Sequence, residues 1–171
     1  MKAGVLKLAI IVVGLNLLFL YIGLYFLPQS ESRPPKVIRI EEGIAQEELI
    51  AAGEKIVFGK GQCMVCHPAT AEPGMRAPAM ATIGADMERE AKQRGMTPEE
   101  QVFEALVNPS KYIVKGFEDM MSPVQKPPTS LTDGEIIAVA AYLQSKGGKV
   151  TVTFPGSVPV LHAQIEKARV K

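Results

Sequence analysis

Two thiols and an imidazole occur within five consecutive residues of this chain, in the run Cys63-Met64-Val65-Cys66-His67. Thiols at this spacing can add to the two vinyl groups of a haem, and the histidine that follows the second thiol can reach the iron. The motif therefore predicts one covalently bound haem c. In this prediction Cys63 and Cys66 form the thioether bonds, and His67 binds the iron.

Other uses of paired cysteines fit the sequence less well. A tetrahedral zinc site needs four ligands, usually with a second C-x-x-C or an H-x₃₋₅-H pattern. The chain has two cysteines and two histidines, and the second histidine, His162, lies far along the chain. A thioredoxin-like dithiol belongs to a βαβ pattern, which the sequence lacks. A plain disulfide needs no adjacent histidine, so it leaves His67 unexplained. The remaining histidine, His162, is expected to face solvent or a partner.

Three amphipathic segments must position this motif. An apolar stripe over 47–60 predicts a helix that ends just before the cysteines. Thr97-Pro98-Glu99-Glu100 and Thr132-Asp133-Gly134-Glu135 both carry the capping-box signature, so further helices should begin there, and Gly147-Gly148 should end the last one. Loops rich in proline and glycine connect them. The predicted fold class is mostly α with long loops, which suits a core filled by a bulky group.

The N-terminal segment is apolar over a length that matches a lipid bilayer. Twenty residues, 8–27, carry no charge, and a helix of this length spans about 30 Å. A cleaved signal peptide is the rival interpretation. Its apolar region usually has about 7–15 residues and ends in a small-x-small site, whereas this run exits through Tyr25-Phe26-Leu27-Pro28. We therefore predict an uncleaved transmembrane anchor at 1–27.

The anchor, the motif and their flanks divide the chain into four predicted parts. Residues 28–45 form an extended linker, because three prolines oppose helix formation there. Residues 46–146 form the haem domain. In the tail, 147–171, residues 149–154 alternate like a strand and 161–169 form a short helix. Since a lone strand is unstable in water, we expect the tail to fold back or to dock on another subunit.

Net charge excludes one class of partner. The chain has 19 basic and 18 acidic residues, which nearly cancel. No polybasic field is present that would attract nucleic acid or anionic lipid. We therefore expect no nucleic-acid partner.

Residues 47–145 resemble class I cytochrome c. The landmarks occur in the family's order: a helix before the C-x-x-C-H motif, then Ala77-Pro78-Ala79-Met80, Asn108-Pro109-Ser110-Lys111-Tyr112 and Leu131-Thr132-Asp133-Gly134-Glu135. The resemblance implies a cytochrome c-like helical haem domain, here with one N-terminal transmembrane helix, on the outer face of the membrane. It also implies that the first and last helices cross at a small residue, and Gly53 against Tyr142 is the expected contact.

The resemblance also implies the remaining haem contacts. The Pro78 backbone carbonyl would fix the His67 ring, and a methionine would be the sixth iron ligand. Met121 lies 54 residues after His67, where the family places that ligand. The family usually has Met-Pro, whereas this chain has Met120-Met121-Ser122-Pro123, so Met120 remains an alternative. The other methionines are expected in the core or in loops: Met64, Met75, Met80, Met87 and Met96.

Some polar residues have two open interpretations. Arg76 and Tyr112 could neighbour the haem or its propionates, or could be an ordinary surface arginine and loop tyrosine. Four lysines could surround an exposed haem edge and steer a negatively charged partner, or could simply be solvated: Lys60, Lys111, Lys115 and Lys126.

These predictions together indicate an electron carrier and not an enzyme, because an iron with both axial positions filled has no open site for a substrate. We expect a membrane-anchored subunit of a respiratory or photosynthetic electron-transfer complex. It would be a single-pass protein of the cytoplasmic (inner) membrane with its haem domain on the periplasmic or extracytoplasmic side, and its partners would be redox donor and acceptor proteins. The alternative is a haem-based gas sensor or enzyme with an open sixth position.

Overall fold

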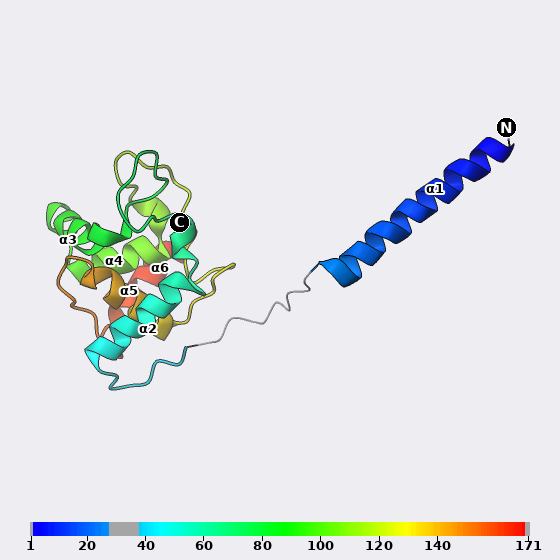
Figure 1. Cartoon of the computed structure of the whole chain (residues 1–171). Helices are drawn as coiled ribbons and strands as arrows, with labels where there is room; N and C mark the ends of the chain where they lie inside the picture. The colour runs from blue at the N-terminus through cyan, green and yellow to red at the C-terminus, as the bar shows by residue number, and fades with distance from the viewer. Residues whose placement is uncertain (1, 28–37, 170–171) are drawn as a thin grey trace. The chain divides into compact units, whose positions relative to one another are not determined.

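The computed structural model describes residues 2–27 and 38–169, which belong to two compact units, 1–35 and 36–171 (Figure 1). Every regular element in the described ranges is helical, and no strand occurs in them. The mostly α fold class is confirmed. The predicted linker at 28–45 lies largely outside the described residues, because its positions 28–37 are not among them.

The N-terminal unit holds one long apolar helix. Helix α1, Lys2–Tyr21, continues into one π-helical turn, Ile22–Phe26. The 24 residues Ala3–Phe26 are long and apolar enough to cross a membrane, a test that a signal sequence also passes. Within the uncharged run 8–27 the one strongly polar side chain is Asn16, which donates from Nδ2 to the Val12 carbonyl oxygen at 2.8 Å. This internal hydrogen bond lowers the cost of placing the amide in hydrocarbon.

Helices α2, Gln46–Phe58, and α5, Asp133–Ser145, form the centre of the second unit. They cross at Gly53, where an added Cβ would lie 2.0 Å from the Ala138 carbonyl oxygen and 2.8 Å from Tyr142 Cβ. Only glycine permits so close an approach. The expected contact between Gly53 and Tyr142 is therefore confirmed.

Helix α4, Pro98–Val107, begins as the sequence predicts. The Thr97 hydroxyl accepts from the Glu100 backbone N–H, and the Glu100 carboxylate accepts from the Thr97 N–H. The same reciprocal capping box, between Thr132 and Glu135, opens α5. These hydrogen bonds satisfy donors that a helix start leaves unpaired.

Helix α3, Ile83–Arg94, was not predicted and corrects the expectation of a loop between α2 and α4. Its apolar signal is weak, because Ile83, Gly84 and Ala91 are its only buried residues. Tertiary packing makes up for this. A Cβ at Gly84 would lie 2.5 Å from the carbonyl oxygens of Leu143 and Gln144, so the start of α3 lies directly on the end of α5.

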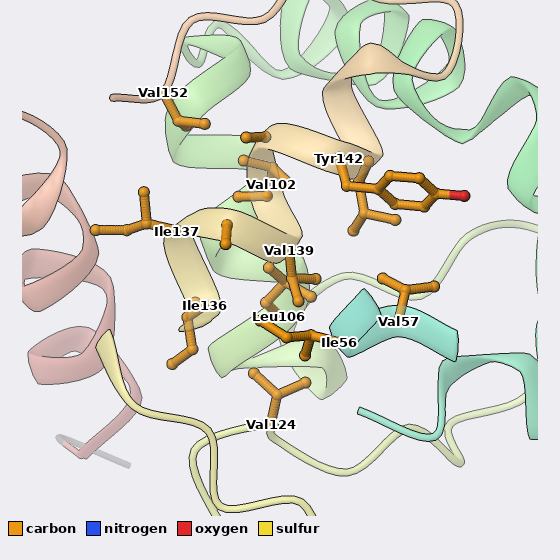
Figure 2. Packing of buried hydrophobic residues seen from close by; sticks show 14 of the residues in the cluster. Ile56, Val57, Val102, Leu106, Val124, Ile136, Ile137, Val139, Tyr142 and Val152 are labelled. Carbon is orange, nitrogen blue, oxygen red and sulfur yellow. The ribbon is translucent and has the colours of Figure 1, made fainter. Parts of the chain in front are cut away.

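The core joins α2, α4 and α5 with the segments that follow them. Figure 2 shows Ile56 and Val57 of α2 in one cluster with Leu106 of α4 and Val139 of α5. Three isoleucines that precede α2 also pack against this cluster: Ile38, Ile40 and Ile44. The packed part of the chain therefore begins before Gln46, inside the segment predicted to be linker.

The C-terminal tail folds back on the domain. Residues 149–154, which alternate like a strand, form no strand in the structure, but Val152 is fully buried. Helix α6, Val158–Arg169, then packs along α4 (Figure 1) and buries Leu161. The predicted short helix is confirmed. A docking role for the tail on another subunit stays a prediction.

Candidate haem site

The loop that carries the cysteines is fixed by close backbone contacts. The Gly61 N–H donates to the Ile56 carbonyl oxygen at 2.7 Å, and a Cβ on Gly61 would lie 2.9 Å from that oxygen. Gln62 adopts a left-handed conformation with φ of 53°, and Cys63–Val65 form one 3₁₀ turn. The His67 N–H closes the turn by donating to the Cys63 carbonyl oxygen at 3.0 Å. This geometry places two sulfurs and one imidazole on a single turn.

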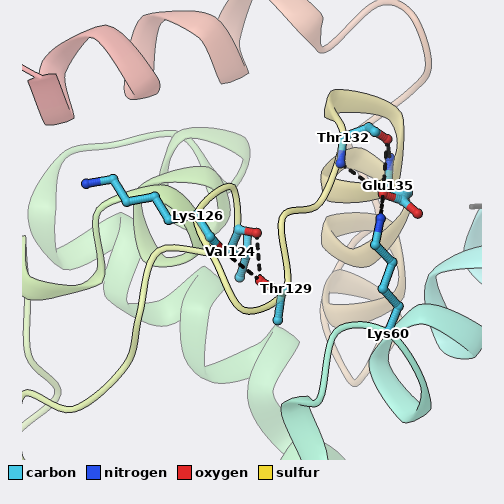
Figure 3. Close-up of polar contacts among 6 residues, drawn as sticks. All are labelled: Lys60, Val124, Lys126, Thr129, Thr132 and Glu135. Atoms are coloured by element: carbon cyan, nitrogen blue, oxygen red, sulfur yellow. Dashed lines mark hydrogen bonds and ion pairs between the residues drawn. The ribbon is translucent and has the colours of Figure 1, made fainter. Parts of the chain in front are cut away.

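An ion pair ties this loop to the start of α5. Lys60 Nζ lies 2.7 Å from Glu135 Oε2, and the Glu135 side chain is fully buried (Figure 3). Burial is the largest influence on the Glu135 pKa and raises it, but hydrogen bonds from Lys60 and Thr132 outweigh it and lower the pKa overall. Glu135 is therefore charged at neutral pH. The ion pair therefore fixes Lys60, which lies three residues before Cys63, against the start of α5.

His67 is oriented by the segment that contains Pro78. Its Nδ1 lies 2.8 Å from the Pro78 carbonyl oxygen. Two backbone hydrogen bonds hold that segment, from Met80 N–H to the Pro68 carbonyl and from Ala81 N–H to the Ala69 carbonyl. Because a carbonyl only accepts, Nδ1 carries the proton and Nε2 keeps its lone pair for a metal. Burial lowers the pKa of His67, and the hydrogen bond to Pro78 opposes this, so the ring is neutral at physiological pH.

The two cysteines have different surroundings. Burial raises the pKa of Cys63 to about 11, although a backbone hydrogen bond opposes the shift. Its Sγ lies 3.6 Å from the Gly61 carbonyl oxygen. Cys66 is exposed. Redox-active C-x-x-C pairs rely on a thiol whose pKa is lowered, so Cys63 does not suit dithiol chemistry.

A cavity of about 500 Å³ lies beside this turn. Its walls come from the motif and the segment after it, from α3, α4 and the segment after α4, and from Leu143 of α5. The apolar and sulfur-containing part of the lining is mostly contributed by Cys63, Val65, Cys66, Met75, Ala77, Pro78, Ala79, Met80, Ile83, Met87, Ala105, Leu106, Ile113, Val114, Phe117, Met120, Met121, Val124 and Leu143. The cavity borders both thiols and the imidazole, whose Nε2 keeps its lone pair. These residues fit a covalently attached haem.

Both methionines proposed as the sixth ligand line the cavity. Met121 is 36% exposed and Met120 is 47% exposed, so neither is locked in the core. Met75, Met80 and Met87 also line it, and Met80 is buried at 5% exposure. The assignment of Met121 as the iron ligand stays a prediction, with Met120 as its alternative.

Other residues considered from the sequence fall into two groups. Arg76 and Tyr112 line the cavity, which favours their interpretation as neighbours of the haem. His162 does not line it, and its Nε2 lies 2.6 Å from Asp133 Oδ2 at the start of α5. The four lysines do not form a free ring, because Lys60 is paired with Glu135 and Lys111 is paired with Glu104.

The sequence patterns did not predict a group of buried, paired polar residues behind the cavity lining, of which only Gln101 lines the cavity itself. Glu104 of α4 is only 2% exposed and forms ion pairs with Arg94 and Lys111. Gln101, one turn earlier, lines the cavity and accepts from Arg94. A glutamate on the apolar side of α4, between Phe103 and Leu106, was the available signal. Its partners could not be read from that pattern.

Comparison with known proteins gives one family. The family model described as Cytochrome c matches residues 50–146, more than half of the chain. The match includes the C-x-x-C-H motif, α3, α4 and α5, and it leaves out α1 and α6. A search of curated proteins found no match.

Proposed function

Because the chain belongs to the cytochrome c family, we propose that it carries single electrons by means of one haem c attached at Cys63 and Cys66. Membership of the family implies covalently bound haem and electron transfer. The observation that carries the more specific proposal is the cavity that borders the Cys63–His67 turn and both candidate methionines. When bound, the haem supplies an iron centre that gains and loses one electron.

The residues of the chain have separate tasks in this proposal. His67, whose Nδ1 is held by the Pro78 carbonyl, would bind the iron through Nε2. Met121 would supply a thioether ligand, which favours the ferrous state and raises the reduction potential. The apolar walls of the cavity would keep water from the iron. With His67 and Met121 both bound to the iron, no position would be left for a substrate, so the protein would act as a carrier and not as an enzyme.

We further propose that α1 anchors the protein in the cytoplasmic membrane, with the haem domain on the periplasmic side. Its 24-residue apolar span and the internally bonded Asn16 support an anchor. An anchor keeps the haem domain near membrane-bound donors and acceptors, which raises their effective concentration. The protein would then serve as a subunit of a respiratory or photosynthetic complex, with other redox proteins as partners.

Intact-mass measurement of the protein purified from its own membranes in mild detergent tests the haem count and the anchor together. The mass should equal the full chain plus one haem. A mass that lacks the N-terminal segment would show a cleaved signal sequence and overturn the anchor. A mass without haem would overturn the carrier proposal.

Carbon monoxide distinguishes the carrier from the sensor or small-ligand enzyme. A reduced iron with a methionine in its sixth position should bind the gas slowly and incompletely. Rapid and complete binding would show an open sixth position and refute the carrier mechanism.

Co-purification from the native membranes tests the proposed place in a complex. Redox subunits that co-purify in fixed proportion would identify the complex, whereas purification of the protein alone would refute a fixed subunit.

A further inference from the structure

A buried carboxylate on α4 joins three segments of the haem domain. Glu104 is 2% exposed, and each of its oxygens has one cationic partner at 2.5 Å, Arg94 Nη2 and Lys111 Nζ. Arg94 is the last residue of α3, and Lys111 ends the 3₁₀ turn Pro109–Lys111 that follows α4. A buried carboxylate without partners is strongly unfavourable, so these ion pairs stabilise Glu104 in its buried position.

Arg94 extends this connection to the cavity wall. Its Nη1 donates to Gln101 Oε1 at 2.7 Å, and its guanidinium lies 4.3 Å from the centre of the Tyr112 ring. Gln101 and Tyr112 both line the cavity. Through Arg94, the Glu104 ion pairs therefore help to fix Gln101 and Tyr112 at the cavity wall. From Tyr112 the chain continues toward Met120 and Met121.

Residues 110–125, which include Met120 and Met121, form the methionine segment. This segment is held to α4 at both of its ends. Before the methionines, Lys111 is paired with Glu104, and the adjacent Ser110 donates from Oγ to Asp119 Oδ1 at 2.9 Å. Asp119 directly precedes Met120. The first half of the segment is thus closed into a loop whose base rests on Glu104.

After the methionines, backbone carbonyls of α4 take over. The Val124 N–H donates to the Leu106 carbonyl oxygen at 3.1 Å, and Gln125 Nε2 donates to the Val107 carbonyl oxygen at 2.9 Å. One short stretch of α4, residues 104–107, therefore holds both ends of the segment. The downstream contacts do not need a charge, whereas the upstream contact depends on Glu104.

We propose that Glu104 is a positioning residue that, through Lys111, holds the segment bearing Met120 and Met121 against the cavity and so keeps a thioether on the iron. This inference rests on the proposed function, because it takes the sixth ligand from this segment. An external ligand can reach the iron only after the methionine has moved away. Glu104 would therefore control how readily the sixth position opens.

The test compares the full-length holoprotein with its Glu104→Gln and Lys111→Gln variants in mild detergent. The measured quantity is the rate at which imidazole replaces the methionine on the ferric iron, followed in the haem absorption spectrum. Both variants should bind imidazole at least about tenfold faster than the unmodified protein, because each loses the contact at the base of the loop. Lys111→Arg, which keeps the positive charge, should restore slow binding.

Glu135→Gln is the matched control. Glu135 is also a buried carboxylate paired with a lysine (Figure 3), but its partner Lys60 lies three residues before Cys63. A general loss of stability would affect both glutamine variants alike. We expect Glu135→Gln to bind imidazole within about twofold of the unmodified rate, since the methionine segment does not depend on it.

Each result has a distinct meaning. If the unmodified protein binds imidazole at once, the methionine ligation in the proposed function is wrong. If the unmodified protein resists and Lys111→Gln resists equally, the positioning role of Glu104 is overturned. Equal acceleration in Glu135→Gln would also overturn it. If Glu104→Gln fails to fold, Lys111→Gln still decides, because it leaves the pair between Glu104 and Arg94 in place.

Discussion

Replacement of Gly53 by alanine should destabilise the haem domain, although alanine favours helices. In the middle of α2, alanine gains about 1 kcal/mol over glycine from helix propensity alone. The added Cβ, however, would lie 2.0 Å from the Ala138 carbonyl oxygen and 2.6 Å from the carbonyl carbon. These are backbone atoms in the interior of α5, so no flexible side chain can move aside.

The magnitude follows from the separation that the helices need. To bring the 2.0 Å contact to at least about 3 Å, α2 and α5 must move apart by about 1 Å. Side chains that are now fully buried at this crossing, such as Ile56 and Val139, would lose close contacts. Overpacking of this kind costs up to about 3 kcal/mol. After the propensity gain, we expect a net loss of about 2 kcal/mol in the free energy of unfolding.

Urea denaturation of the full-length holoprotein in detergent measures this loss. The haem Soret absorbance is the suitable signal, because it reports the haem domain without a contribution from α1. Gly134→Ala in α5 is the control. Its Cβ would lie 3.1 Å from Ile40 Cβ, which is only a few tenths of an ångström too close, and Ile40 belongs to an irregular segment that can move by that amount, so the stability of this variant should stay within about 1 kcal/mol of the unmodified protein. A Gly53→Ala protein as stable as the unmodified one would refute this account of the crossing.

Three further results are expected. Glu135→Gln should lower the free energy of unfolding by about 3 kcal/mol in the same urea assay, since it leaves Lys60 without its carboxylate while a glutamine can still cap α5. Glu104 and Glu135 both have lowered pKa values in the folded protein. Their contribution to the free energy of unfolding is therefore complete above the unfolded pKa of about 4.3, and it is lost as pH falls through their folded pKa values. Urea midpoints between pH 6 and pH 3 should therefore decrease most steeply below about pH 4, and less so for Glu104→Gln. Deletion of 149–171 should lower the melting temperature in a Soret-monitored thermal scan, because it removes the fully buried Val152 and Leu161 from the domain; an unchanged melting temperature would contradict the packing of the tail.

Local patterns predicted the helices that begin with strong signals. Thr97 and Thr132 announce α4 and α5, because a capping box depends only on residues three apart in the chain. The apolar stripe of α2 is similarly local. Helix α3 escaped prediction because Ile83 and Ala91 are its only buried apolar side chains, and its position is decided by contact with the end of α5. The alternating run 149–154 predicted a strand wrongly, since Val152 is buried against helices and has no neighbouring strand to pair with in the described part of the chain.

The sequence alone determined the chemistry of the site, because C-x-x-C-H contains the thiols and the imidazole within five residues. It also determined the length of the apolar run near the N-terminus, which can be counted directly along the chain. Tertiary structure decided what surrounds that chemistry. The Pro78 carbonyl, 2.8 Å from His67, is eleven residues away in the chain, and Lys60 and Glu135 are separated by 75 residues. Glu104 obtains its partners from two other segments, ten and seven residues away. Such contacts are absent from any local pattern, because they form only when helices pack and a buried charge must find the groups that can neutralise it.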